Sequence, residues 1–162
     1  MEKGATFDTI GIYRYGLTRR WYPKKATALF IMLNPSTADA EIEDPTVRRC
    51  MGYARDWGCG GLEVVNIFAL RSTDPAALYT AEDPIGPENN RFILEAAERA
   101  QAIIAAWGTH GKLHGRGKEV LKLLEHFDVW SLGTTSQGHP KHPLYLRKDL
   151  TPEFLQKGRP SL

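Results

Sequence analysis

Four short apolar runs, separated by segments with helical periodicity, divide most of this chain. The runs cover residues 28–33, 62–68, 102–107 and 128–132, and the helical segments cover residues 44–57, 87–100 and 120–127. Apolar runs of this length that alternate with helices are typical of α/β proteins, in which right-handed crossovers join parallel strands. We therefore predict a three-layer α/β/α fold with a four-stranded parallel central sheet.

Two further segments flank this predicted core. Residues 7–21, which mix tyrosines with arginines, are predicted to form an antiparallel hairpin centred on residues 15–17, and residues 152–156 a short helix. We interpret the chain as a single α/β domain with an N-terminal hairpin extension (1–27), a core (28–150) and a C-terminal tail (151–162).

Composition and the absence of certain motifs argue against several classes of protein. The chain has 162 residues, of which 42% are hydrophobic, and no apolar stretch approaches the roughly 18 residues that cross a bilayer. Because the N-terminus also lacks the layout of a secretory signal, we expect a cytoplasmic protein without membrane contact. Cys50 and Cys59 lack metal-ligand spacing, and no glycine-rich phosphate loop follows a strand, so we expect no metal and no cofactor.

Each apolar run ends at its C-terminal side in a short polar cluster, and these clusters are predicted to meet. The carboxyl ends of parallel strands form one rim of an α/β sheet, where ligands bind. The clusters are Asn34-Pro35-Ser36-Thr37, Asn66-Ile67-Phe68, Trp107-Gly108-Thr109 and the segment from Gly138 to Pro143. We therefore predict a binding site on this rim.

The first cluster offers an amide and nearby carboxylates. Pro35 stiffens the turn after Asn34, so the amide is held in place and can bind a base or orient a water molecule. The alternative is a plain turn in which Ser36 or its neighbour caps a helix. Asp39 is a candidate general base, and Asp44, a predicted helix N-cap, is the other.

The second cluster places an amide inside an apolar strand. Such an amide is costly to bury unless it is hydrogen-bonded, so Asn66 either ties down a neighbouring loop or contacts a ligand. Arg71 follows on the same rim, where it can hold a phosphate or carboxylate or pair with Asp74.

The last two clusters are aromatic and basic. Glycine after Trp107 permits a sharp turn or the close approach of a ligand, although we slightly favour a core tryptophan followed by a turn. His139 and His142 each precede a proline in a glycine-flanked loop, and one of them is predicted to have an electrostatic or acid–base role. Solvent-exposed histidines are the alternative, which we favour for His110 and His114.

The rim motifs carry a resemblance at two levels. Nearly the whole chain resembles the uncharacterised bacterial and phage family called domain of unknown function 1643. The shared motifs are Met32-Leu33-Asn34-Pro35-Ser36-Thr37-Ala38-Asp39, Asp44-Pro45-Thr46, Gly60-Gly61-Leu62, Asn66-Ile67-Phe68-Ala69 and His142-Pro143-Leu144. More distantly, the order of Asn34, Asn66, Trp107-Gly108 and His142-Pro143 is similar to that of the uracil-DNA glycosylase superfamily.

The distant resemblance implies a fold and a mechanism. It implies a glycosylase-like topology in which Asn66 pairs with a flipped base, Asn34 positions water and His142 stabilises the departing base. Catalysis would thus fall to Asn34, Asp39 and His142, and substrate binding to Pro35, Ser36, Asn66, Phe68, Arg71, Trp107, Gly108 and His139. Nucleic-acid contacts would come from Leu144, Tyr145, Arg147 and Lys148.

The expected function is recognition of a nucleobase or nucleic acid, with hydrolysis of an N-glycosidic bond as the reaction that the resemblance implies. Asn34 stands where the most active glycosylases have Asp, which favours recognition ahead of excision. The expected partner is DNA or a small molecule that contains a nucleobase. Two alternatives remain: a non-catalytic module that binds nucleic acid or a nucleotide, and an enzyme that binds a small molecule unrelated to DNA.

Overall fold

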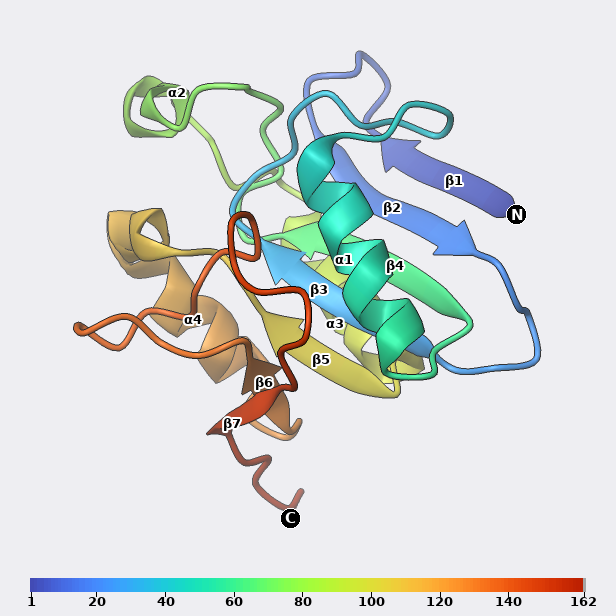
Figure 1. Cartoon of the computed structure of the whole chain (residues 1–162). Helices are drawn as coiled ribbons and strands as arrows, with labels where there is room; N and C mark the ends of the chain where they lie inside the picture. The colour runs from blue at the N-terminus through green and yellow to red at the C-terminus, as the bar shows by residue number, and fades with distance from the viewer. Residues whose placement is uncertain (162) are drawn as a thin grey trace.

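The computed structural model describes residues 1–161, and a mixed seven-stranded sheet forms its centre (Figure 1). The strand order is β1-β2-β4-β3-β5-β6-β7. β4, β3, β5 and β6 pair in parallel, whereas β1, β2 and β7 are antiparallel to their neighbours. The strands are β1 (Glu2–Phe7), β2 (Arg14–Arg20), β3 (Thr27–Met32), β4 (Gly61–Asn66), β5 (Ala102–Ala105), β6 (Val129–Ser131) and β7 (Glu153–Gln156).

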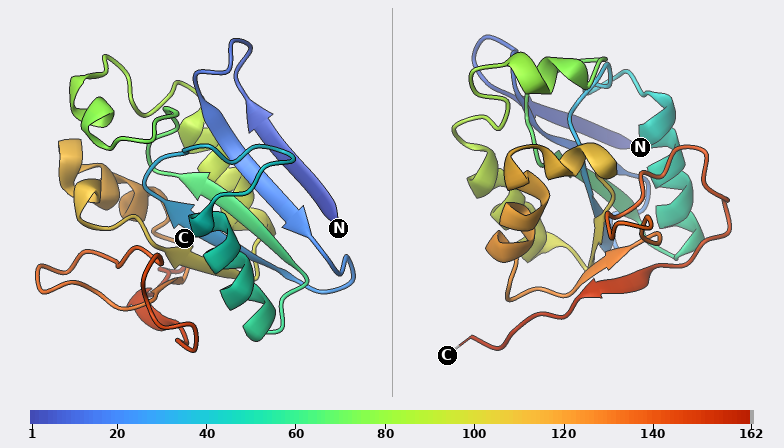
Figure 2. Two further views of the ribbon diagram at one scale, coloured as in Figure 1. Left: turned by 45° about the horizontal axis from the view of Figure 1, so that its top comes forward. Right: turned by 90° about the vertical axis from the view of Figure 1, so that its left-hand side faces the viewer.

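Helices cover both faces of this sheet, as the alternating pattern predicts. In Figure 2 (right), α1 lies on one side of the sheet, and α3 and α4 lie on the other. The helices are α1 (Pro45–Asp56), α2 (Ala76–Thr80), α3 (Asn89–Arg99) and α4 (Arg116–Leu123), with a 3-10 helix η1 at Thr109–Gly115. The α/β class is confirmed, although the sheet is larger and more mixed than predicted.

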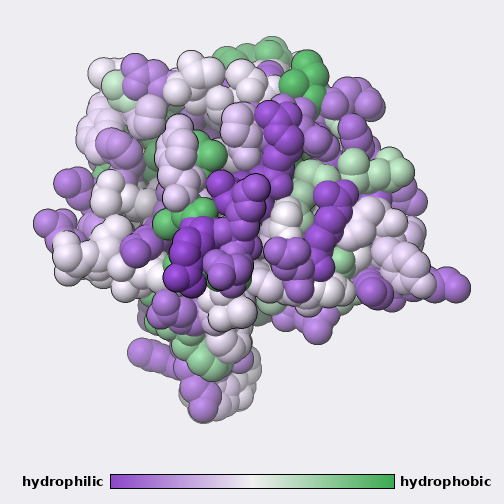
Figure 3. All heavy atoms as spheres, viewed as in Figure 1, coloured by the Kyte–Doolittle hydropathy of each residue, from purple (hydrophilic) through white to green (hydrophobic). Residues whose placement is uncertain are grey.

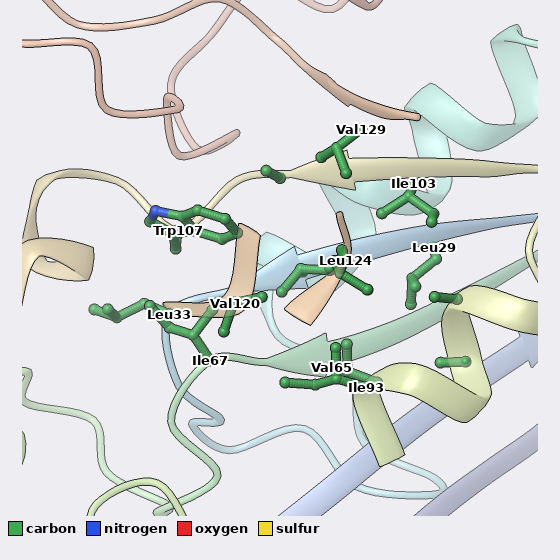
Figure 4. Close-up of a cluster of buried hydrophobic side chains, with 14 of the residues drawn as sticks. Leu29, Leu33, Val65, Ile67, Ile93, Ile103, Trp107, Val120, Leu124 and Val129 are labelled. Carbon is green, nitrogen blue, oxygen red and sulfur yellow. The ribbon is translucent and has the colours of Figure 1, made fainter. Parts of the chain in front are cut away.

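Two apolar cores follow from the strand alternation. Leu29 and Ile31 of β3 point to the α3 and α4 face, whereas Phe30 and Met32 point to the α1 face. Figure 4 shows the first core, in which Trp107 lies at one end beside Leu33. Burial on both faces explains why the parallel strands read as continuous apolar runs.

The N-terminal hairpin exists, but its predicted centre is wrong. Residues 15–17 lie inside β2, and the chain reverses at residues 8–13. The Asp8 backbone N–H donates to Tyr13 O, and the Tyr13 N–H donates to Asp8 Oδ1, each at 3.0 Å. Gly11 has φ +76°, a conformation that favours glycine. The Asp and Gly of this turn were the stronger reversal signal.

The C-terminal segment forms a strand, and the predicted short helix is wrong. β7 pairs antiparallel with β6, and the Phe154 ring stacks on the Trp130 ring with centroids 3.7 Å apart. Pairing satisfies the edge of β6, and that stabilisation depends on a strand distant in sequence, so local propensity does not reveal it.

Across residues 1–161, no helix is both long and apolar enough to cross a membrane.

Candidate functional site

A pocket of about 450 Å³ lies where β3, β4 and β5 end. Met32 and Val64 line it from the strands, and Val47 lines it from the first turn of α1. The pocket therefore lies at the α1 side of the carboxyl rim, where an α/β sheet places its ligands. It brings together seven of the predicted site residues: Asn34, Ser36, Asn66, Trp107, Gly108, His142 and Leu144.

Asn34 is a tether at the pocket wall. Its Nδ2 donates to Pro35 O at 3.1 Å, Leu70 O at 3.3 Å and Ser72 O at 3.0 Å. These bonds join the loop after β3 to the loop after β4, so the turn interpretation holds for the Nδ2 atom. Its Oδ1 accepts no hydrogen bond within residues 1–161 and remains able to bind a ligand.

Asn66 differs from Asn34 because its side chain ties down nothing. The residue is 1% exposed, and neither Oδ1 nor Nδ2 has a hydrogen-bond partner in the described part of the chain. Its backbone carbonyl is satisfied by Asn89 Nδ2 at 2.8 Å. An unpaired buried amide costs about 1–3 kcal/mol for each group left unsatisfied. Asn66 lines the pocket, so a ligand there can recover that cost.

Arg14 also lines the pocket, although no motif in the sequence predicts it as a site residue. The residue is 2% exposed at the start of β2, with Nη1 donating to Ala38 O at 2.8 Å and Nε unpaired among the described residues. Burial lowers the pKa of Arg14 to about 10, and Asp44 opposes this shift. Its neighbours Tyr15 and Leu17 are apolar and buried, but an arginine in a tyrosine- and arginine-rich segment gives no local signal of burial.

His142 faces the pocket in a defined tautomer. Its Nδ1 accepts from the Leu144 backbone N–H at 3.2 Å, so the neutral ring carries its proton on Nε2. Burial lowers the pKa of His142, and the nearby Asp44 carboxylate opposes this effect. A neutral imidazole with a free N–H can donate to a carbonyl oxygen or a developing anion.

The third and fourth rim clusters are joined through their backbones. Gly108 has φ +73° and ψ −167°, a region open essentially to glycine, and its N–H donates to Pro140 O at 2.9 Å. A Cβ added at Gly108 would lie 3.6 Å from that of His142. Trp107 is both a core residue and a pocket wall, so its two interpretations are compatible.

Asp44 is the carboxylate that the pocket contains within the described residues. It caps α1, and its Oδ1 accepts from the Val47 N–H at 2.8 Å. Asp39 lies outside the pocket: its Oδ1 accepts from the Glu41 and Ile42 backbone N–H groups, which lower its pKa. The pocket therefore does not include the candidate general base Asp39, because its own turn holds the side chain.

Other predicted site residues also lie away from the pocket. Arg71 donates to Gly11 O at 3.3 Å and lies over the Phe7 ring, so it neither faces the pocket nor pairs with Asp74. Phe68 is fully buried in the α3 and α4 core. Pro35 contributes its carbonyl to the Asn34 tether, and His139 lies in the neighbouring loop, where its N–H donates to Thr135 Oγ1 at 3.1 Å.

The residues predicted to contact nucleic acid lie beside the pocket mouth. Leu144 lines the pocket, whereas Tyr145 is 90% exposed at φ +69°. Arg147 pairs with Asp149 at 3.1 Å, and Lys148 lies farther along the same segment. This exposed aromatic and basic segment thus adjoins the pocket through Leu144.

His110 lies at the mouth, which corrects its interpretation as surface decoration alone. It lines the pocket from η1, and its Nδ1 lies 3.1 Å from Tyr79 Oη of α2. This contact links two segments that flank the opening. Within residues 1–161, no three His, Cys, Asp or Glu side chains form a group able to hold a metal ion.

The chain is thus an α/β protein with a polar pocket at the carboxyl rim of its sheet, the position where α/β sheets place their ligands. The chain belongs to the family described as "Protein of unknown function (DUF1643)", which matches residues 14–144. This confirms the closer resemblance, and the match begins at Arg14 and ends at Leu144, two residues that line the pocket. The chain matches no curated protein and no solved structure.

Proposed function

We propose that the rim pocket binds a nucleobase and that Asn66 recognises its hydrogen-bonding edge. The observation that carries this proposal is the buried amide of Asn66, whose donor and acceptor are both unpaired within residues 1–161. A nucleobase presents adjacent donors and acceptors in one plane, and an amide can satisfy two of them at once. A bound nucleobase then supplies the hydrogen bonds that the Asn66 amide lacks in the folded chain.

The rest of the pocket suits a planar polar ring. Arg14 and the Nε2–H of His142 supply donors for carbonyl oxygens, while Leu33 and Trp107 supply apolar walls. The volume of about 450 Å³ falls within the usual range for small-ligand pockets, roughly 300–1,000 Å³. This combination of apolar walls and a few convergent polar groups favours a base or nucleoside as ligand.

The geometry favours recognition ahead of excision. Asn34 cannot take a proton from water, and its Nδ2 is occupied by three carbonyl oxygens. Asp39, the other predicted base, is held in its own turn. Neither Asn34 nor Asp39 is therefore placed to take a proton from a water molecule in the pocket.

A second candidate function, slow hydrolysis of an N-glycosidic bond, is supported by Asp44. Its Oδ2 accepts no hydrogen bond within the described residues, and it shares the pocket with His142. In this reaction Asp44 takes a proton from water, the resulting hydroxide attacks the sugar carbon, and the bond to the base nitrogen breaks. The base leaves with the electron pair, and the His142 Nε2–H stabilises its charge.

The same proposal extends to the edge of the pocket. Tyr145 presents an exposed aromatic ring beside Leu144, and Lys148 adds a positive charge on the same segment. Aromatic and basic groups next to a base pocket are suited to stacking and backbone contact with a single strand.

Binding measurements with the full chain test this function. Free bases, nucleosides and oligonucleotides containing uracil or hypoxanthine are titrated by calorimetry, and strand cleavage is followed after alkali treatment. We expect nucleoside binding that weakens at least about tenfold in Asn66→Leu, because two hydrogen bonds are lost. We expect no cleavage. Cleavage that disappears in Asp44→Asn would replace recognition by excision, and failure of every base and nucleoside to bind would overturn the proposal.

A further inference from the structure

A second depression lies on the outer side of α1, and we call it the α1 groove. It has a volume of about 500 Å³ and is bounded by α1 residues from Pro45 to Asp56 and by Leu144 and Lys148 of the C-terminal loop. Two hydrogen bonds hold that loop against the helix. Tyr53 Oη donates to Arg147 O, and Trp57 Nε1 donates to Leu150 O at 3.1 Å. The groove is therefore a built feature of the fold.

The lining of the α1 groove is basic. Arg48, Arg49 and Lys148 contribute three positive charges, against one carboxylate from Asp56. None of the three cations takes part in an ion pair with any described residue. Figure 3 shows strongly hydrophilic side chains gathered on the face that α1 occupies in Figure 1.

Arg49 has an unsatisfied donor within this basic setting. Its Nη1 is buried and has no acceptor in residues 1–161, and Arg49 is one of the residues that line the groove. A buried guanidinium nitrogen without an acceptor is unfavourable, and an anion that binds the guanidinium fork satisfies it. The charge excess and the unpaired nitrogen are separate observations that indicate the same kind of ligand.

The α1 groove adjoins the rim pocket. Leu144 lines both, and α1 divides its first turn between them: Asp44 and Thr46 face the pocket, whereas Pro45 faces the groove. A ligand whose base enters the pocket can therefore extend past Leu144 with its sugar and phosphate toward Arg48 and Arg49.

We propose that the α1 groove is a phosphate subsite and that the ligand is a nucleotide rather than a free base or nucleoside. This inference rests on the proposed function of the rim pocket. A phosphate oxygen pair matches the planar fork of an arginine, and Lys148 adds a point charge. The phosphate comes either from a free mononucleotide or from a nucleic-acid strand.

Gly52 provides the test because it lines the groove and has open space around it. A Cβ added at Gly52 has no heavy atom within 4 Å, and the residue lies inside α1, where Glu and Gln are better helix formers than Gly. Gly52→Glu therefore adds a negative charge without disturbing the fold, and Gly52→Gln adds the same bulk without charge. Gln101→Glu makes the same charge change directly before β5, outside the lining of the groove.

The probes are inorganic phosphate, the four ribonucleosides, their 5′-monophosphates and a short single-stranded oligonucleotide. We expect monophosphates to bind at least about tenfold tighter than nucleosides. Gly52→Glu is expected to remove this gain, Gly52→Gln to keep most of it and Gln101→Glu to keep all of it. Nucleoside affinity is expected to be the same in all three variants. A loss of monophosphate affinity by a chain that does not bind the oligonucleotide supports a free nucleotide, and an equal loss for both probes supports a strand.

Inorganic phosphate separates failure of this inference from failure of the proposed function. If no nucleoside binds the wild type but phosphate binds and is lost in Gly52→Glu, the base pocket fails and the anion subsite stands. If nucleosides bind but monophosphates bind no tighter, the phosphate subsite is overturned and the base pocket stands. Equal phosphate binding by the Glu and Gln variants of Gly52 also overturns it.

Discussion

The imidazole of His142 accepts a 3.2 Å hydrogen bond at Nδ1 from the backbone N–H of Leu144, two residues along the chain. This bond assigns the proton of the neutral ring to Nε2, and it ties the orientation of the ring to the loop that closes the pocket. The donor available to a ligand at this position is thus decided by a local backbone contact.

The first prediction concerns the pH dependence of stability. Burial lowers the pKa of His142 in the folded chain, so the unfolded chain takes up its proton at a higher pH than the folded chain does. The contribution of His142 to the free energy of unfolding is therefore present above the usual pKa of about 6.5, and it is lost as pH falls from that value through the folded pKa.

Urea unfolding of wild type and His142→Gln between pH 5 and 8 measures this contribution. We expect a steeper loss of stability below about pH 6.5 in the wild type than in the variant. Parallel pH profiles for the two proteins would contradict a lowered pKa for His142.

The second prediction contrasts the two rim amides. Asn66→Leu removes two unpaired buried groups, so we expect unfolding free energy to rise by about 1–2 kcal/mol, or roughly 2–8 °C in Tm, while nucleoside binding is lost. Asn34→Leu is the matched control. It releases three carbonyl oxygens and should lower stability by about 1–3 kcal/mol. Scanning calorimetry measures the Tm of both variants. A lower Tm for Asn66→Leu than for the wild type would show that the Asn66 amide is structural.

The third prediction concerns Arg19, which is fully buried in β2. Its Nε donates to Glu43 at 3.0 Å and its Nη2 to Asp39 O at 2.6 Å, so it holds the loop before α1 against the sheet. Arg19→Met should lower stability by about 3 kcal/mol, because it leaves these acceptors without their donor. The neighbouring Arg20→Met, which removes one exposed hydrogen bond, should cost less than about 1 kcal/mol.

Amide hydrogen exchange locates the Arg19 effect. Faster exchange at Glu41 and Ile42 is expected in Arg19→Met, because their N–H groups bond to Asp39 in the same loop. Unchanged exchange there would mean that the loop is held by other contacts.

The fourth prediction concerns the backbone of Gly108. Gly108→Ala should destabilise the protein by about 1–3 kcal/mol because alanine is strained at this positive φ. The added Cβ would make only an ordinary contact, 3.6 Å from that of His142, so no clash contributes. Ligand affinity should fall as well, since Gly108 positions the loop that carries His142. Gly52→Ala is the control: it lies inside α1 and should stabilise by about 0.5–1 kcal/mol. A neutral Gly108→Ala in urea titrations would argue against strain.

The fifth prediction concerns Tyr145, which is 90% exposed and has a backbone in the left-handed conformation. Tyr145→Gly removes the strain of that conformation, so stability should change by less than about 1 kcal/mol. If the ring stacks on a strand, oligonucleotide affinity should fall by roughly tenfold or more, while mononucleoside affinity stays unchanged. Equal oligonucleotide binding by both proteins would exclude this contact.

Part of the site could be predicted from the chain because neighbouring residues decide it. The Asp44-Pro45 pair predicts the start of α1, and the structure places the Asp44 carboxylate on the Val47 N–H. Asn34 follows one apolar run, Asn66 lies near the end of the next and His142 lies in the segment after the last, and the pocket contains all three. Polar residues at the carboxyl ends of neighbouring parallel strands lie on the same rim, whatever segments connect the strands. Their proximity therefore requires only that the strands are parallel neighbours.

Other features depend on partners that are far apart in sequence. Arg14 reaches the pocket because β2 pairs with β4, and its tether Ala38 lies 24 residues away. Nothing local distinguishes the buried Arg14 and Arg19 from Arg20, which is partly exposed. The same limit explains β7, which forms because β6 presents an unpaired edge.

The amino-acid sequence by itself determined the α/β alternation, the capped start of α1 and the gathering of polar residues at one rim, because these follow from periodicity and nearest-neighbour hydrogen bonding. Only the tertiary structure decided that Asn34 is a tether while Asn66 stays unpaired, and that His142 rather than His139 faces the pocket. Two asparagines have the same chemistry in a sequence. Their roles diverge because the carbonyl oxygens within reach of each amide are set by how the loops pack.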